Sequence, residues 1–204
     1  MSSHQPISFR FIVFLVLSIV CLTSSACADI KPPVDRFRAE DEATAIKLRK
    51  SSEKGDASAQ NTLGLLYVKG KGVPQDYRQA KEWFEMAAKQ GHAGAQVNLG
   101  TMYFHGDGAP RSTEMALHLF SLAAEQEDAL AFAKLGLMYA QGRGVLQDFI
   151  QAHKWYNLSA AHGELKAAEA RDVLAQQMTP TQVAEAQKLA GEWKPKGKGT
   201  PAAL

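Results

Sequence analysis

Histidines are the side chains of this chain best suited to bind a metal ion or to move protons, because imidazole does both near neutral pH. Five of them lie between residues 92 and 162. No two stand four residues apart, the spacing with which one helix presents two imidazoles to zinc. We therefore interpret them as solvated, with His118 and His153 at exposed helix positions, and predict no metal and no cofactor. The five are His92, His105, His118, His153 and His162.

Glycine pairs form the second pattern with chemical potential, since glycine-rich loops bind phosphates. They follow segments with helical periodicity rather than strands and recur at a fixed interval, which favours turns over a nucleotide site. The chain also lacks H-E-x-x-H, G-x-S-x-G and phosphate-loop motifs. We predict no catalytic residues and a non-enzymatic protein. The pairs are Gly70/Gly72, Gly106/Gly108 and Gly142/Gly144.

Aromatic residues are the third candidate, as a cage for a ligand. Trp83 and Trp155 stand at equivalent positions of the repeat described below, and Trp193 lies in a helix near the end of the chain. Side chains that recur in register belong to a core more often than to a site, so we predict that the tryptophans pack.

The first 28 residues have the pattern of a secretory signal. Phe11–Leu22 is an apolar run too short to span a membrane comfortably, and Ala26–Ala28 forms an A-x-A cleavage site. We expect cleavage after Ala28 and a periplasmic or secreted protein. An uncleaved anchor is one alternative. Lipidation of Cys27 is another, although Ser24 stands where a lipoprotein signal has a leucine-like residue.

Charge and cysteine content exclude several classes of function. The formal net charge of +2 gives no strong attraction to nucleic acid, so no nucleic-acid partner is predicted. A membrane is contacted only through the signal segment, if it stays uncleaved or is lipidated. Cleavage removes both cysteines, Cys21 and Cys27, and with them any disulfide or reactive thiolate.

The elements that must position these side chains repeat every 36 residues, the kind of period found in helical arrays. Ala59, Leu63 and Tyr67 lie at i, i+4 and i+8 on one face of a helix, and Gly64 weakens that helix by about 1 kcal/mol relative to alanine. A glycine kept there in each repeat suggests that a second helix approaches closely. The recurring sets are Ala59, Ala95, Ala131 and Ala167; Leu63, Leu99 and Leu135; Gly64, Gly100 and Gly136; Tyr67, Tyr103 and Tyr139; and Ala80, Ala116 and Ala152.

A second helix follows each glycine turn. Asp76 is a predicted N-cap, and Gln79 three residues later completes a capping-box pattern that Asp148 repeats. In the middle repeat the cap is Ser112. After the third repeat the glycine pair is absent, and Thr179-Pro180 opens a final helix that we expect to cover the open end of the stack.

The pattern A-x-x-x-L-G-x-x-Y-x-x-G-x-G-V-x-x-D-x-x-x-A-x-x-W-[FY]-x-x-A-A-x-x-G resembles the Sel-one-like repeat, a relative of the tetratricopeptide repeat. The resemblance implies an all-α, right-handed α-solenoid of helix-turn-helix repeats with helical caps. This sequence departs from the pattern at Ala109, Ser112, Leu119 and Glu127. The predicted divisions are a signal at 1–28, a lead-in and capping helix at 29–56, repeats at 57–91, 93–127 and 129–163, capping helices at 164–194 and a tail at 195–204.

In such an array the first helices line a concave groove, and their positions outside the core are the candidates for partner binding. Several of these positions are apolar, which indicates a groove for an apolar or amphipathic segment of a protein partner. The alternative is that these side chains pack against neighbouring helices. The candidates are Asn61, Leu65, Val68, Lys69, Val97, Thr101, Phe104, His105, Leu137 and Gln141, with Ala133 and Ala140 completing the third repeat.

Three functions remain open at the level of sequence. The first is an exported, non-enzymatic scaffold for protein–protein interaction, with an unidentified protein or peptide as partner. The second is an envelope enzyme or binder acting on peptidoglycan or β-lactams, an activity linked to cysteine-rich relatives whose cysteines this chain lacks. The third is a secreted factor that acts on a host.

Overall fold

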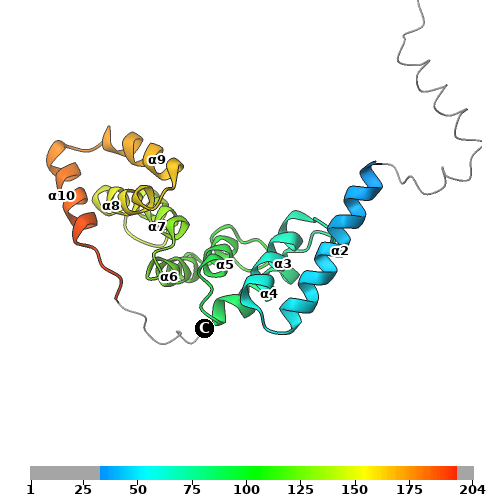
Figure 1. Ribbon diagram of the computed structural model, residues 1–204. Helices are drawn as coiled ribbons and strands as arrows, with labels where there is room; N and C mark the ends of the chain where they lie inside the picture. Colours follow the sequence, from blue (N-terminus) through cyan, green and yellow to red (C-terminus); the bar gives the residue numbers. More distant parts are fainter. Residues whose placement is uncertain (1–32, 197–204) are drawn as a thin grey trace, which may run out of the picture. The chain divides into compact units, whose positions relative to one another are not determined.

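The computed structural model describes residues 33–196 (Figure 1). The chain divides into two compact units, Met1–Asp41 and Glu42–Leu204, and the account below concerns the second. The predicted signal at 1–28 and residues 197–204 of the predicted tail lie outside the described residues. Within the described range, no helix is both long and apolar enough to cross a membrane.

Residues 33–196 contain helices and no strand, which confirms the predicted all-α solenoid class. The first, α2, begins in the first unit and ends in the second. Helices α3 to α8 form the three predicted repeats, two helices each, and α9 and α10 follow. The helices are α2 (Pro33–Glu53), α3 (Ala57–Lys69), α4 (Tyr77–Lys89), α5 (Ala93–His105), α6 (Thr113–Ala124), α7 (Ala129–Gln141), α8 (Phe149–Ala161), α9 (Leu165–Ala175) and α10 (Pro180–Glu192).

The starts of the second helices of the repeats are capped as predicted. The Asp76 carboxylate accepts hydrogen bonds from the backbone N–H groups of Arg78 and Gln79, and Asp148 and Ser112 cap α8 and α6 in the same way. The predicted capping box at Gln79 is wrong, because the Asp76 N–H that its side-chain oxygen would accept from donates to the Tyr67 carbonyl instead, at 3.0 Å. The full box forms at Thr179, at the start of α10.

The first helices of the repeats end in left-handed glycines. Gly70, Gly106 and Gly142 have φ of 63°, 87° and 63°, and each donates its N–H to a carbonyl four residues earlier. A side chain would strain this conformation, which explains the first glycine of each pair. The first glycine of each pair therefore ends a helix, and the second has positive φ in the turn that follows, so the pairs form turns as the sequence predicted.

The helical glycines bring the two helices of each repeat into close contact. A Cβ on Gly64 would stand 2.6 Å from the Phe84 ring, and a Cβ on Gly100 2.7 Å from the Phe120 ring. Gly136 faces Tyr156 in the same way, at 2.7 Å. The predicted close approach is confirmed, and its cause is one aromatic ring per repeat that occupies the space of the missing side chain.

The core continues from one repeat to the next. Within repeats, α3 packs on α4, α5 on α6 and α7 on α8, and between repeats α4 packs on α5 and α6 on α7. Leu63, Leu99 and Leu135 are buried at the predicted positions. This stacking places the outer face of each first helix beside the next repeat.

Helix α2 lies within the predicted lead-in and capping helix at 29–56, and its first residue is a proline, which the first helical position tolerates. In the part of α2 that belongs to the second unit, Ile46 is 71% exposed. Ala45 is buried instead. A polar contact joins α2 to the first repeat: the Gln60 amide donates to the Ser52 carbonyl at 3.0 Å.

Helix α10 ends the array by packing on the third repeat. It packs on α8, which already belongs to the third repeat, rather than pairing with α9 as the second helix of a further repeat. Its Ala190 and the following Trp193 contact the core cluster that contains Phe132. Helices α9 and α10 therefore both lie against the third repeat, and Leu165 and Val173 of α9 remain exposed.

Candidate functional site

Two of the predicted groove residues are core residues. Val97 is 4% and Phe104 5% exposed, and both belong to the cluster that they form with residues of α6 and α7. The Arg143 guanidinium lies over the Phe104 ring, 5.2 Å from its centre. The expectation that these two side chains face solvent is wrong. The sequence of α5 alone leaves them outside the core of their own repeat, but the neighbouring repeat covers them.

The other apolar candidates are half-buried. Leu65 and Val68 pack against the cluster of the first two repeats, and Leu137 packs against that of the second and third. Each keeps part of its surface accessible. The apolar part of the candidate surface is thus a set of partly covered side chains rather than a deep groove.

The polar candidates separate into two groups. Lys69, His105 and Gln141 end α3, α5 and α7 and are exposed. Asn61 and Thr101 are half-buried. The Thr101 hydroxyl donates to the Val97 carbonyl at 2.8 Å, so its hydrogen is already used within its own helix.

Asn61 takes part in a contact that the sequence analysis missed. The Asn98 side-chain amide of α5 donates to the Asn61 oxygen of α3 at 2.9 Å, which joins the first helices of two repeats. Within residues 33–196, Asn61 Nδ2 and Asn98 Oδ1 make no further hydrogen bond. A donor and an acceptor therefore remain side by side. The signal was two asparagines 37 residues apart, one more than the period.

Lys134 of α7 holds the repeat position that Asn98 holds in α5. It is half-buried, and burial lowers the pKa of its ammonium group. It forms no ion pair with any residue in the part of the chain that the structure describes. A partly desolvated cation gains from a carboxylate or carbonyl partner. The row formed by Asn61, Asn98 and Lys134 is hereafter the asparagine–lysine row.

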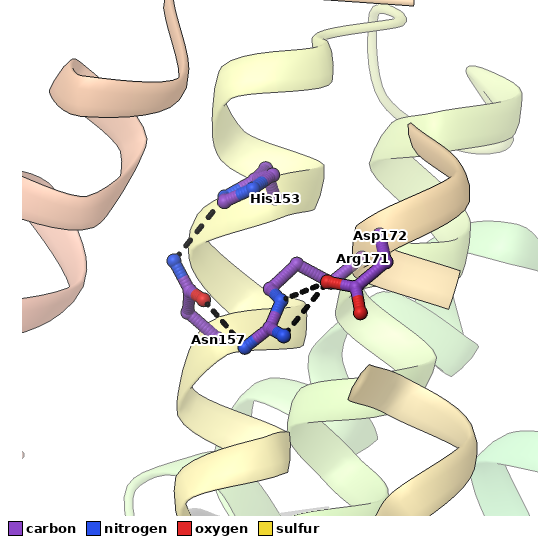
Figure 2. A network of polar contacts seen from close by, with 4 residues as sticks. All are labelled: His153, Asn157, Arg171 and Asp172. Carbon is purple, nitrogen blue, oxygen red and sulfur yellow. Dashed lines mark hydrogen bonds and ion pairs between the residues drawn. The ribbon is translucent and has the colours of Figure 1, made fainter. Parts of the chain in front are cut away.

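His153 lies elsewhere than predicted. It is 2% exposed, and its Nδ1 lies 3.2 Å from Asn157 Nδ2 (Figure 2). Asn157 Oδ1 accepts from Arg171 of α9 at 3.3 Å, and Arg171 pairs with Asp172 at 2.7 Å. Burial lowers the pKa of His153, and the Arg171 charge adds to this while Asp172 opposes it. The exposed placement of His153 was wrong because α9 and α10 both pack on α8, whereas His118 is exposed as predicted.

The tryptophans pack, as the sequence analysis predicted. Phe132 stacks on Trp155 with ring centres 5.9 Å apart, and Trp193 meets Phe132 edge-on at 5.1 Å. The indole N–H groups of Trp83 and Trp155 are buried without a hydrogen-bond partner in the described structure. The rings fill a core and leave no open cage.

Among the described residues, no three side chains of histidine, cysteine, aspartate or glutamate come together to hold an ion. The geometry found in residues 33–196 offers hydrogen bonds, partly desolvated lysines and half-buried apolar surface. These are the means of binding a polypeptide.

Comparison with known proteins identifies the class. The family model of the Sel1 repeat matches residues 57–92, 93–128 and 129–164, which together are more than half of the chain. The chain belongs to the Sel1 repeat family. Proteins of this family generally act as scaffolds for protein–protein interaction, and the fold is typically non-catalytic.

Two solved structures show the same fold. A Sel1 repeat protein from Oxalobacter formigenes matches at 29% identity with a TM-score of 0.61, over 74% of this chain and 45% of that one. The protein c5321, a protective antigen of uropathogenic Escherichia coli strains with an SLR fold, matches at 24% identity with a TM-score of 0.56, over 96% of this chain and 49% of that one. This chain thus spans about half the length of each. No curated protein matches it significantly.

Proposed function

We propose that this protein is an exported, non-enzymatic scaffold that binds a segment of a partner protein along the asparagine–lysine row. The observation that carries this is the Asn98–Asn61 hydrogen bond, which links α5 to α3 and leaves one amide donor and one acceptor unused. An extended peptide presents carbonyl and N–H groups that match such a pair.

Lys134 defines the chemistry expected of the partner. A half-buried ammonium group without an ion pair favours a ligand that brings a carboxylate to it. The half-buried Leu65, Val68 and Leu137 add apolar surface on the same first helices of the repeats. We infer an acidic partner segment with apolar side chains, for which the family's general role as interaction scaffold provides the setting.

Crosslinking in intact cells followed by mass spectrometry will identify the partner, and binding of that partner to purified variants tests the surface. Lys134→Glu should weaken binding about tenfold or more, since a hydrogen bond to a charged group contributes about 1.5–3 kcal/mol. Asn98→Ala should weaken it about twofold to tenfold, since a neutral hydrogen bond contributes about 0.5–1.5 kcal/mol. Lys89→Glu, an exposed charge reversal at the end of α4, is the matched control. Unchanged affinity in both row variants, with intact helix content, would refute this surface.

Export is a separate part of the proposal and has a separate test. The apolar run and the A-x-A site support a signal that is removed after Ala28. Mass analysis of the protein from cells should find a chain that starts at Asp29. A lipid-modified Cys27, or an intact N-terminus, would contradict this cleavage without touching the binding proposal. The comparisons give no support to the alternative of an enzyme acting on peptidoglycan or β-lactams.

A further inference from the structure

Polar side chains join α8 to α9 at a position where the first helices of the three repeats have a buried leucine. Arg171 occupies in α9 the register position of Leu63, Leu99 and Leu135, and it reaches back to Asn157 of α8 (Figure 2). His153 is the buried end of this network. The junction of α8 and α9 therefore includes a chain of hydrogen bonds in addition to the apolar cluster of Ala152, Tyr156, Ala167 and Leu174.

The direction of the hydrogen bonds fixes the protonation state of His153. Arginine has only donors, so Asn157 Oδ1 accepts from Arg171. The Asn157 amide nitrogen then donates to Nδ1 of His153. An imidazole nitrogen that accepts carries no proton, so His153 in this junction is neutral and its hydrogen is on Nε2.

We propose that His153 is an acid-sensitive latch between α8 and α9: protonation of its Nδ1 removes the acceptor for Asn157, breaks the chain to Arg171 and releases α9 from α8. A protonated imidazole has two donors and no acceptor, and it brings a second positive charge toward the Arg171 guanidinium. Burial makes this charge more costly than it would be in water.

The charged groups that act on His153 both come from α9. Arg171 disfavours the protonated ring, and Asp172 favours it. No charged group in the described parts of α7 or α10, the other helices packed on α8, contributes to its pKa shift. Arg171 is held to Asp172 by two hydrogen bonds from its guanidinium, of 2.7 and 2.9 Å, so the two charges move together with α9. Release of α9 therefore takes both of these charges away from the ring.

The sign of the pH dependence follows from the lowered pKa. Release of α9 removes the Arg171 charge and part of the cover of His153, so the pKa of His153 returns toward the ordinary value of 6.5. Above that pH the closed junction keeps its full stability. As the pH falls below 6.5 the open form binds the proton better, and the opening equilibrium rises by up to about tenfold per pH unit, because one proton is taken up. The rise ends when the closed form also protonates.

Amide hydrogen exchange of the full-length protein between pH 5.0 and 7.5 measures this opening, after correction for intrinsic rates. Amides of α9 should lose protection below pH 6.5 while those of α5 do not. In His153→Gln, whose amide oxygen can still accept from Asn157, α9 should show no such loss. His118→Gln replaces an exposed histidine and should behave like the wild type.

Two charge variants test the network itself through the NMR titration of the His153 ring. Arg171→Leu, which restores the residue of the three repeats, should raise the titration midpoint, and Asp172→Asn should lower it. Protection of α9 that is flat with pH in the wild type, or a loss that persists in His153→Gln, would overturn the latch. Midpoints that do not move in the two charge variants would overturn the role of Arg171 and Asp172.

Discussion

Gly100→Ala places a methyl group where the two helices of the second repeat meet most closely at a helical glycine. The added Cβ would stand 2.7 and 2.9 Å from two ring carbons of Phe120 and 3.3 Å from the Leu119 Cβ. Phe120 is 1% and Leu119 0% exposed, so neither side chain can turn into solvent to make room. The backbone of α5 and α6 must separate instead.

Two opposing effects set the size of the change. Alanine is favoured over glycine inside a helix by about 1 kcal/mol. Overpacking a close-packed core costs about 1–3 kcal/mol, and contacts this short on immobile groups place the cost near the upper end. We expect Gly100→Ala to lower the free energy of unfolding by about 2 kcal/mol.

Gly191→Ala is the matched control, since Gly191 lies within α10 and a Cβ added to it would meet no atom within 4 Å. This variant should raise the free energy of unfolding by up to about 1 kcal/mol. Urea unfolding followed by circular dichroism measures both changes, with an unchanged urea dependence showing that the unfolded states are comparable.

A double variant identifies the ring as the cause. Phe120→Leu removes the carbons that the new Cβ meets, so Gly100→Ala should cost less in that background, with a coupling on the order of 0.5 kcal/mol or more, as is typical of contacting pairs. If Gly100→Ala stabilises the protein as Gly191→Ala does, close approach is not the reason for the helical glycine, and the account of the repeat fails.

Two further changes have definite expected outcomes. Phe104→Asp should destabilise the protein by about 3–5 kcal/mol in thermal or urea unfolding, because it leaves an unpaired carboxylate in the core of the second and third repeats; a fold left intact would mean that Phe104 faces solvent after all. Glu127→Gly should stabilise it by about 1 kcal/mol, because Glu127 has φ of 59° where the other repeats have Gly91 and Gly163, and an unchanged midpoint of unfolding would show that this conformation carries no strain.

Periodicity predicted most of the fold because each repeat uses the same local chemistry. Asp76 and Ser112 cap helices through their own backbone neighbours, and Gly70 ends a helix through its own conformation. Such features depend on a few adjacent residues, so they can be read from a single sequence. The helical glycines could be read too, because only a close neighbour explains a costly residue that recurs.

The candidate site was harder to predict because it depends on what the next repeat covers. Val97 and Phe104 look outward on α5, yet α7 and its neighbours bury them. The burial of His153 could not be predicted because the same position of the other two repeats holds Lys81 and Leu117, one charged and one apolar. One signal was present in the sequence: Arg171 in a leucine position, which implies a polar partner on the facing helix.

The Leu-Gly pair in the first helix of each repeat also limits where further repeats can be added to the array. Each second helix docks its ring over the glycine of a Leu-Gly pair, and α9 has Arg171-Asp172 in that register. A further second helix would meet a carboxylate side chain where its ring needs empty space. Duplication of the 36-residue unit can therefore lengthen this protein only by insertion ahead of α9, so the sequence of one helix fixes the end at which new repeats are excluded.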